Sequence, residues 1–136
     1  MTAPPLSEQR MVALINHERQ ARGIRPLSAD EGLMRLARER VEDMAARHYL
    51  GHEDPVTGEL LARQLVQAAG YQSAWVGENW YAASTPPPDL VDEAMGWFMA
   101  DPPHAANILE SHHTQVGVGI AFNGEWWLLV QIFTGP

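Results

Sequence analysis

The chain has 136 residues, a length that suits one domain with one hydrophobic core. Nine basic and 17 acidic residues give a net charge of −8, which argues against a nucleic-acid partner, because phosphate binding needs a clustered basic surface. Because the chain has no cysteine, it can form neither a disulfide framework nor a thiolate zinc site, and it has no cysteine nucleophile.

No apolar run approaches the roughly 20 residues of a membrane-spanning helix. The residues after Met1 do not form the basic and apolar regions of a signal peptide. Two alternatives stay open: the protein remains inside the cell, or a leader has been removed. We expect a single domain over residues 1–136, in which residues 1–6 form a flexible N-terminal segment.

Two helices are predicted in the first third of the chain. The first begins near Ser7, a potential cap, and stops at Gly23. The second follows Ser28 or Asp30, which are competing caps. Its apolar residues recur at spacings of three and four, as one buried stripe requires. The stripe comprises Leu33, Leu36, Ala37, Val41, Met44, Ala45 and His48.

Shorter helices are predicted over residues 59–69 and 88–99, with a helical turn over 105–109. Leu60, Leu61, Leu65 and Val66 are expected to face inward from the first of these. Strands are predicted over residues 75–83, 115–122 and 125–134. Asn123-Gly124 predicts a hairpin between the last two, because both residues tolerate positive φ.

The last two strands are too apolar for a sheet with one face in water, so we expect helices to cover both faces. The predicted fold class is α+β, a three-layer α-β-α sandwich around a small, mainly antiparallel sheet. The neighbours Trp126 and Trp127 point to opposite faces of a strand. One of them therefore meets a covering helix on the opposite face or is exposed as a binding surface.

Histidines and one acidic residue are the candidates for chemistry. His52, His104 and His112 lie in or beside predicted loops, where functional residues concentrate. Glu78 has the most apolar surroundings of any carboxylate here, and a buried carboxylate is costly unless it is paired. It is therefore a structural hydrogen-bond hub or a site residue. Imidazoles and one carboxylate suit a divalent metal, but the spacing matches no local metal motif. No Gly-x-Ser-x-Gly nucleophile motif is present.

These stretches resemble the cysteine-rich secretory, antigen 5 and pathogenesis-related (CAP) family, in its small cysteine-free bacterial form. The resemblance runs from about residue 8 to residue 134 and rests on motifs in the family's order. They are Asn16-His17-Glu18-Arg19, Gly51-His52-Glu53-Asp54-Pro55, Gly77-Glu78-Asn79, Pro103-His104-Ala105-Ala106-Asn107-Ile108-Leu109, His112-His113-Thr114-Gln115-Val116 and Gly117-Val118-Gly119.

The resemblance implies an α-β-α sandwich with a shallow cleft that carries two His and two Glu in eukaryotic relatives, some of which bind zinc. His52 and Glu78 match the first His and the first Glu, and His112 matches the second His. The second Glu falls near Ala100 and is absent, with Asp101 an approximate substitute. His104 belongs to the bacterial pattern. We therefore expect a cleft of His52, Glu78, His104 and His112, with His52, Glu78 and His112 as possible ligands of Zn²⁺ or another divalent cation.

Three functions are compatible with the sequence. The first is an extracellular or cell-surface binding module whose cleft takes a divalent metal or a small apolar or lipid ligand, as the resemblance implies. The second is a zinc-dependent hydrolase of the peptidase type, with Glu78 as general base. The third is a structural or interaction domain with a vestigial cleft. The missing second Glu and the lack of a His-Glu-x-x-His helix favour a non-enzymatic role.

Overall fold

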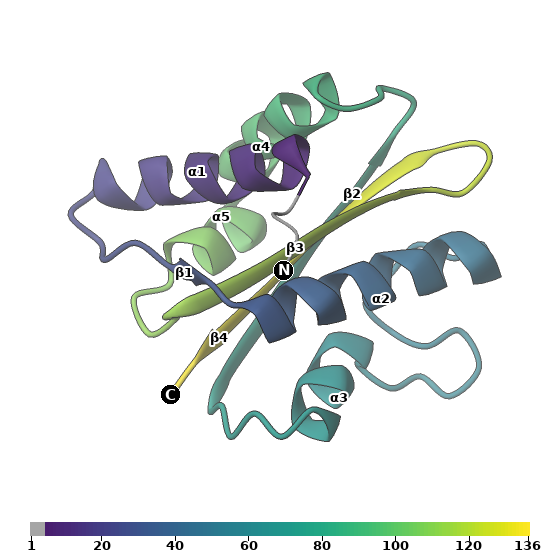
Figure 1. The fold of residues 1–136 in the computed structure, drawn as a ribbon, viewed down its shortest axis with the longest axis horizontal. Coiled ribbons are helices and arrows are strands. Elements are labelled where there is room, and N and C mark those ends of the chain that lie inside the picture. Colours follow the sequence, from purple (N-terminus) through teal and green to yellow (C-terminus); the bar gives the residue numbers. More distant parts are fainter. Residues whose placement is uncertain (1–4) are drawn as a thin grey trace.

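The structure is a computed structural model that describes residues 5–136. A four-stranded sheet lies between two layers of helices, as expected (Figure 1). The helices are α1 (Leu6–Gln20), α2 (Glu31–Arg47), α3 (Leu61–Ala68), α4 (Asp89–Ala100) and α5 (Pro102–Leu109). The strands are β1 (Ser28–Ala29), β2 (Trp75–Ala83), β3 (Gln115–Phe122) and β4 (Trp127–Gly135). Most of the predicted N-terminal segment over residues 1–6 lies outside the described residues, and Leu6 already begins α1.

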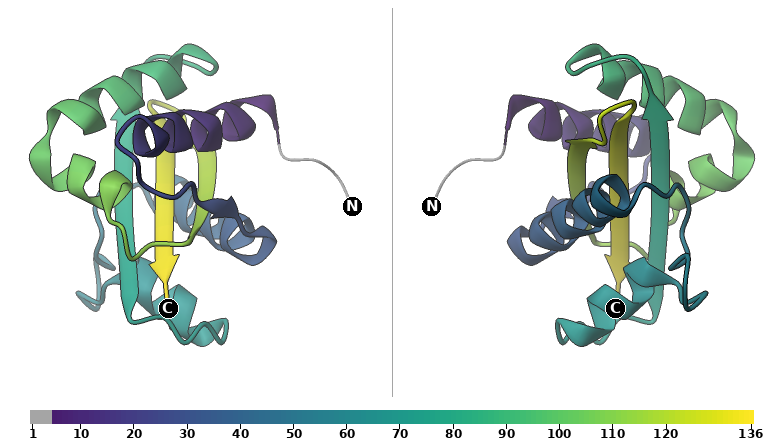
Figure 2. Two further views of the ribbon diagram at one scale, coloured as in Figure 1. Left: turned by 90° about the vertical axis from the view of Figure 1, so that its left-hand side faces the viewer. Right: turned by 90° about the vertical axis from the view of Figure 1, so that its right-hand side faces the viewer.

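The sheet order is β1-β3-β4-β2, so β2 is an edge strand (Figure 2). β3 pairs antiparallel with β4, and β4 pairs antiparallel with β2. Only the two-residue strand β1 runs parallel to its neighbour β3. β1 is not predicted by the sequence, because a strand of two exposed residues leaves no hydrophobic period to detect.

Each face of the sheet has its own core. Side chains from α1, α4 and α5 pack on one face, around Phe98, Ile108 and Phe133. Side chains from α2 and α3 pack on the other face, around Met44 and Val66. Because side chains alternate along a strand, β4 supplies Leu129 and Phe133 to the first core and Leu128, Val130 and Ile132 to the second.

Several predicted details differ from the structure. Pro5, not Ser7, occupies the N-cap of α1, because Ser7 is already inside the helix. Asp30 is the cap of α2 and accepts a hydrogen bond from the backbone N–H of Leu33. His48 is exposed rather than part of the buried stripe, because it ends α2 in the left-handed conformation. Leu60 precedes α3 and is half exposed, while Ala62 and Val66 are the buried residues of that helix.

The hairpin agrees with the sequence, and a buried arginine links α1 to the segment before β3. Gly124 has a φ of 97° between β3 and β4. Trp127 packs against the core, whereas Trp126 is 38% exposed. Arg19 is fully buried and donates to the carbonyls of Arg25, Ile108, Glu110 and His113, which ties α1 to the segment before β3.

Candidate functional site

Glu78 lies in the middle of β2 and points toward α2. Its side chain is only 5% exposed. Arg40 of α2, also buried, places its Nε 2.9 Å from Glu78 Oε2 and donates from Nη2 to Oε1 at 3.3 Å. His52 Nδ1 lies 2.7 Å from the same Oε1. An ionised carboxylate only accepts hydrogen bonds, so Nδ1 of His52 carries the proton and donates it.

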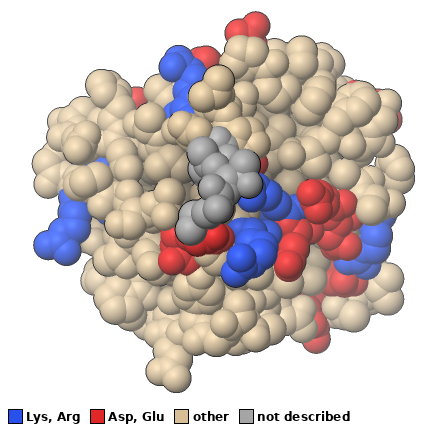
Figure 3. Space-filling model, viewed as in Figure 1, with Lys and Arg blue, Asp and Glu red and all other residues tan. Residues whose placement is uncertain are grey.

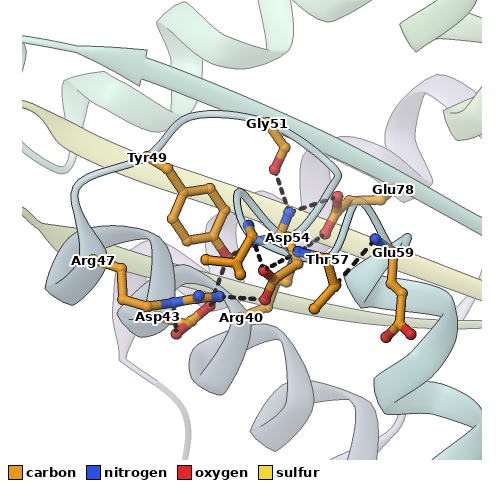
Figure 4. A network of polar contacts seen from close by, with 10 residues as sticks. Arg40, Asp43, Arg47, Tyr49, Gly51, Asp54, Thr57, Glu59 and Glu78 are labelled. Carbon is orange, nitrogen blue, oxygen red and sulfur yellow. Dashed lines mark hydrogen bonds and ion pairs between the residues drawn. The ribbon is translucent and has the colours of Figure 1, made fainter.

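Arg40 also holds the loop that carries His52 (Figure 4). Its Nη2 donates to the carbonyl of Gly51, and its Nη1 donates to the hydroxyl of Tyr49 at 2.9 Å. The Tyr49 hydroxyl in turn donates to Asp43 at 2.6 Å. Burial and this bond to Asp43 raise the pKa of Tyr49 to about 12, so the phenol keeps its proton at neutral pH. One buried cation therefore fixes both Glu78 and the backbone beside His52.

A second set of contacts holds the same loop farther along. Arg47 pairs with Asp43 at 2.9 Å and with Asp54 at 2.8 Å. Asp54 also accepts backbone N–H bonds from Val56 and Thr57. Hydrogen bonds from Arg47 and from these two N–H groups lower the pKa of Asp54 to about 2. The loop between α2 and α3 is thus built around charged side chains, not around an apolar core of its own.

His104 is held in the same manner as His52, but from the other layer. Its Nδ1 lies 2.5 Å from Asp101 Oδ2, and its ring stacks on Phe98 with 5.3 Å between centroids. Trp97 meets the ring edge-on at 4.9 Å. His52 and His104 therefore each have Nδ1 fixed by a carboxylate. Their Nε2 atoms have no hydrogen-bonding partner within residues 5–136.

The two rings line one hollow of about 430 Å³, here called the β2-edge cleft. Its lining consists of Gly51, His52, residues 80–82 of β2, Trp97 and His104. Trp80 lies edge-on to His52, at 6.5 Å, and Tyr81 is tilted against Trp97 at 6.1 Å. Trp97 is 47% exposed. The cleft is therefore mostly aromatic, with two oriented imidazoles.

A smaller hollow of about 120 Å³ lies on the other side of His52. It is lined by Leu60, Ala62, Arg63 and Val76, together with Gly77, His52 and Glu78. We call it the α3 pocket. His52 thus stands between two hollows that follow the outer edge of β2.

His112 is placed differently from the other predicted site residues. It stacks on Trp75, with 3.9 Å between centroids, and its Nδ1 lies 2.6 Å from Glu110. Trp75 precedes Glu78 by three positions on β2, so the two side chains point to opposite faces of the sheet. The structure thus brings together His52 and Glu78 by contact, and His52 and His104 by a shared cleft, while His112 contacts Trp75 and Glu110.

Sequence reasoning missed Arg40, although a signal for it was present. Arg40 follows Leu36 by four residues and precedes Met44 by four, so it occupies a position on the apolar stripe of α2. An arginine at such a position predicts a buried partner of opposite charge. Ala100 does not enter the cleft lining, and Asp101 acts there only through His104.

The three-layer fold and the His-lined cleft at a sheet edge define the class of this protein, an α-β-α sandwich domain. The sequence profile of the cysteine-rich secretory protein family, CAP, matches residues 12–133. The chain therefore belongs to the CAP family.

Comparisons with single proteins agree. The chain is 32% identical over 120 residues to YkwD of Bacillus subtilis, a protein described as uncharacterized. The match spans 88% of this chain but only 44% of YkwD, so it covers less than half the length of this curated relative.

Two bacterial structures share the fold. An outer surface protein of Borrelia burgdorferi superposes with a TM-score of 0.81 at 12% identity, covering 98% of this chain and 96% of that one. An extracellular protein of Bacillus anthracis that contains an SCP domain gives a TM-score of 0.75 at 21% identity, covering 98% of this chain and 45% of that one.

One related structure was determined with zinc. NaASP2 with Zn²⁺ gives a TM-score of 0.68 at 11% identity, over 97% of this chain and 83% of that one. Within residues 5–136 of the present chain, no group of three or more His, Cys, Asp or Glu side chains is arranged to hold a metal ion. In the same residues, no helix is long and apolar enough to cross a membrane.

Proposed function

We propose that this CAP domain is an extracellular or cell-surface binding module whose β2-edge cleft takes a small ligand with an apolar or aromatic part. The observation that carries the proposal is the cleft lining. Trp80, Tyr81 and Trp97 supply apolar surface, and His52 and His104 supply two fixed polar groups. Ligand sites in proteins combine a mostly apolar wall with a few oriented polar groups in this way.

Membership of the family and the location of two relatives support the extracellular or surface assignment. One structural relative is an outer surface protein and another is an extracellular protein. Charged side chains of both signs are interspersed over α2, whereas the rest of the same face carries few charges (Figure 3). An interspersed pattern gives solubility without a single-sign field, so we assign no nucleic-acid partner.

The cleft is tested by comparing two exposed tryptophans. Indole and decanoate serve as probes, titrated into the ¹⁵N-labelled domain and followed through amide chemical shifts. Trp97→Ala removes a cleft wall and is expected to weaken binding by about tenfold, since burying a large aromatic surface contributes on the order of 1.5–3 kcal/mol. Trp126→Ala is the matched control, because this residue is similarly exposed but lies in the β3–β4 turn. Equal losses in both variants, or no binding of either probe, would contradict the proposal.

A divalent cation is a second candidate for the same cleft. Metal-bound histidines usually donate their other ring N–H to a carboxylate, and both His52 and His104 do so. Their free Nε2 atoms are suitable ligands for Zn²⁺, whereas Glu78 is already neutralised by Arg40. A cation held here would have two protein ligands and would keep its remaining positions for water or for a group of the bound ligand.

The zinc hypothesis predicts different effects on Zn²⁺ binding for substitutions of His104 and of His112. Zn²⁺ is titrated by calorimetry into untagged protein. His52→Ala and His104→Ala are expected to weaken binding at least tenfold, and His112→Ala to leave it unchanged. Binding should also weaken below about pH 6, because a protonated imidazole cannot bind a metal ion. Losses in His52→Ala and His112→Ala, with none in His104→Ala, would instead support the ligand set that the family resemblance implies.

Peptidase activity is disfavoured by the contacts of Glu78. A general base needs a carboxylate that can take a proton from water. Both oxygens of Glu78 face Arg40, and one also accepts from His52. The role that these contacts support is to orient His52. A casein digestion assay tests this: activity that is present in the purified domain and lost in Glu78→Gln would restore the hydrolase alternative.

A further inference from the structure

The outer edge of β2 has unpaired backbone groups. The carbonyl of Val116 accepts from Asp30, so Val116 points its backbone groups away from β4 and Gly117 points them toward it. Gly117 pairs with Ile132, so the even-numbered residues of β4 direct their backbone groups toward β3. The odd-numbered residues of β4 therefore direct theirs toward β2. Those residues pair with odd-numbered residues of β2, among them Asn79 and Tyr81. The even-numbered residues of β2 therefore direct their N–H and C=O groups outward.

One of these outward positions is already covered. Asn107 of α5 donates from its side-chain amide to the carbonyl of Glu78 at 3.1 Å, which agrees with the outward direction. His52 covers the same position from the α2 side, through its bond to the Glu78 side chain. Two and four residues farther along, Trp80 and Ala82 have no such cover. Their N–H and C=O groups have no hydrogen-bonding partner in the described part of the chain.

Trp80 and Ala82 form the floor of the β2-edge cleft. Gly51 and His52 stand on one side of that floor, and Trp97 and His104 stand on the other. The free strand edge is therefore recessed between two walls. A sheet edge from a second copy of the domain brings its own covering helices and does not fit between these walls, whereas a single extended chain does.

We propose that the ligand of this cleft is an extended peptide segment that pairs with the edge of β2 at Trp80 and Ala82. The inference rests on the proposed binding function and names the chemical class of the ligand. The two outward residues offer two donors and two acceptors, which is the pattern that a third strand requires. Alternate side chains of the peptide face the two walls, and one of them lies against Trp97.

The backbone of the peptide is the part to test. The probe is a pool of N-acetylated, C-amidated hexapeptides whose third and fifth positions carry Val, Leu, Phe, Tyr or Trp. The best binder is compared with the same peptide N-methylated at alternate nitrogens. Methylation leaves the side chains in place and removes the donors. The edge-pairing peptide is expected to shift the amide signals of Trp80 and Ala82 and to lose at least fivefold in affinity when methylated.

A substitution in the protein tests the same backbone pairing from the other side. Ala82→Pro removes one outward N–H without breaking the ladder to β4, and proline is tolerated on edge strands. Ala82→Pro is expected to weaken peptide binding at least fivefold. Val76→Pro removes an outward N–H at the same edge in the α3 pocket, outside the cleft, and is expected to leave the affinity within twofold.

The outcomes separate this inference from the proposed function. If indole or decanoate binds but no peptide of the pool does so at millimolar concentration, the cleft binds ligands and the peptide assignment is wrong. If the methylated peptide binds as well as its parent, side chains and not the strand edge carry recognition, and the inference is again wrong. If no probe of any kind binds, the proposed function fails together with it.

Discussion

At the scale of single residues, Arg40 is the group on which the site depends. It is 1% exposed and contacts Glu78, Tyr49 and Gly51 at once. Arg40→Ala leaves the Glu78 carboxylate buried without a cation, so we expect a loss of about 3–5 kcal/mol of stability. Arg47→Ala removes a cation of the same helix that is 37% exposed, and it is expected to cost much less stability, because solvent screens exposed ion pairs. Urea denaturation measures both, and similar losses would contradict the assigned role of Arg40.

His113 makes the stability of the domain depend on pH. It is 4% exposed and stacks on Phe133, and burial lowers the pKa of His113 to about 4. In the unfolded chain its pKa is about 6.5, so between these values the unfolded state binds a proton that the folded state does not. Stability is therefore highest above pH 6.5 and falls as the pH drops toward 4, by about 2 kcal/mol at pH 5.

Thermal unfolding between pH 7 and pH 4.5 checks this expectation. His113→Gln cannot be protonated and should show a shallower decline than the wild type. The neighbour His112 is half exposed, so His112→Gln should keep the wild-type decline. The assignment to His113 fails if the two variants lose stability with the same pH dependence.

How far the site could be predicted depends on the kind of information that each residue carries. Glu78 and His52 were predictable, because a carboxylate in apolar surroundings needs a partner and motifs of the family mark both positions. The relation of His104 and His112 to the cleft was not, because it depends on the sheet face toward which each chain segment turns. That property comes from long-range pairing and leaves no local trace in the sequence.

At the scale of elements, the contact between α2 and β3 requires glycine. A Cβ at Gly117 would overlap the backbone carbonyl of Leu33, and one at Gly119 would lie 2.9 Å from the backbone of Ala37. Gly117→Ala should therefore push α2 away from the sheet and destabilise the domain by about 2 kcal/mol or more. Gly96 in α4 has open space at its Cβ position, so Gly96→Ala should stabilise the domain by about 0.5–1 kcal/mol. Urea denaturation curves compare the two variants, and equal effects would show that the close approach is unimportant.

The elements themselves were largely predictable. β2 and β3 begin and end where the sequence places them, and the apolar period locates the long helix α2. The ends of helices were less certain, because alternative caps such as Ser28 and Asp30 differ only in contacts that form after folding. The inward face of α3 was predicted correctly at Leu65 and Val66, but it includes Ala62 in place of Leu60, since an eight-residue helix contains too little of the 3.6-residue period to fix its phase.

At the scale of the whole molecule, one sheet separates two cores and links them. β4 contributes alternate side chains to both, so neither core can open without disturbing the other. We expect Ile108→Ala in the first core and Met44→Ala in the second to cost about 2–5 kcal/mol each. In each variant, circular dichroism and tryptophan fluorescence should give coincident denaturation curves. Separate transitions would show that the two layers unfold independently.

The loop that carries His52 is anchored at its base, and its tip is exposed. Glu53 pairs with Leu60, Arg47 holds Asp54, and residues 55–58 project into solvent. Such a segment tolerates foreign sequence, since exposed loop tips accept insertions while their anchors keep the scaffold in place. Residues 55–58 are therefore a place to graft a randomised loop next to the cleft, which turns the domain into a small, cysteine-free scaffold for selecting new binders.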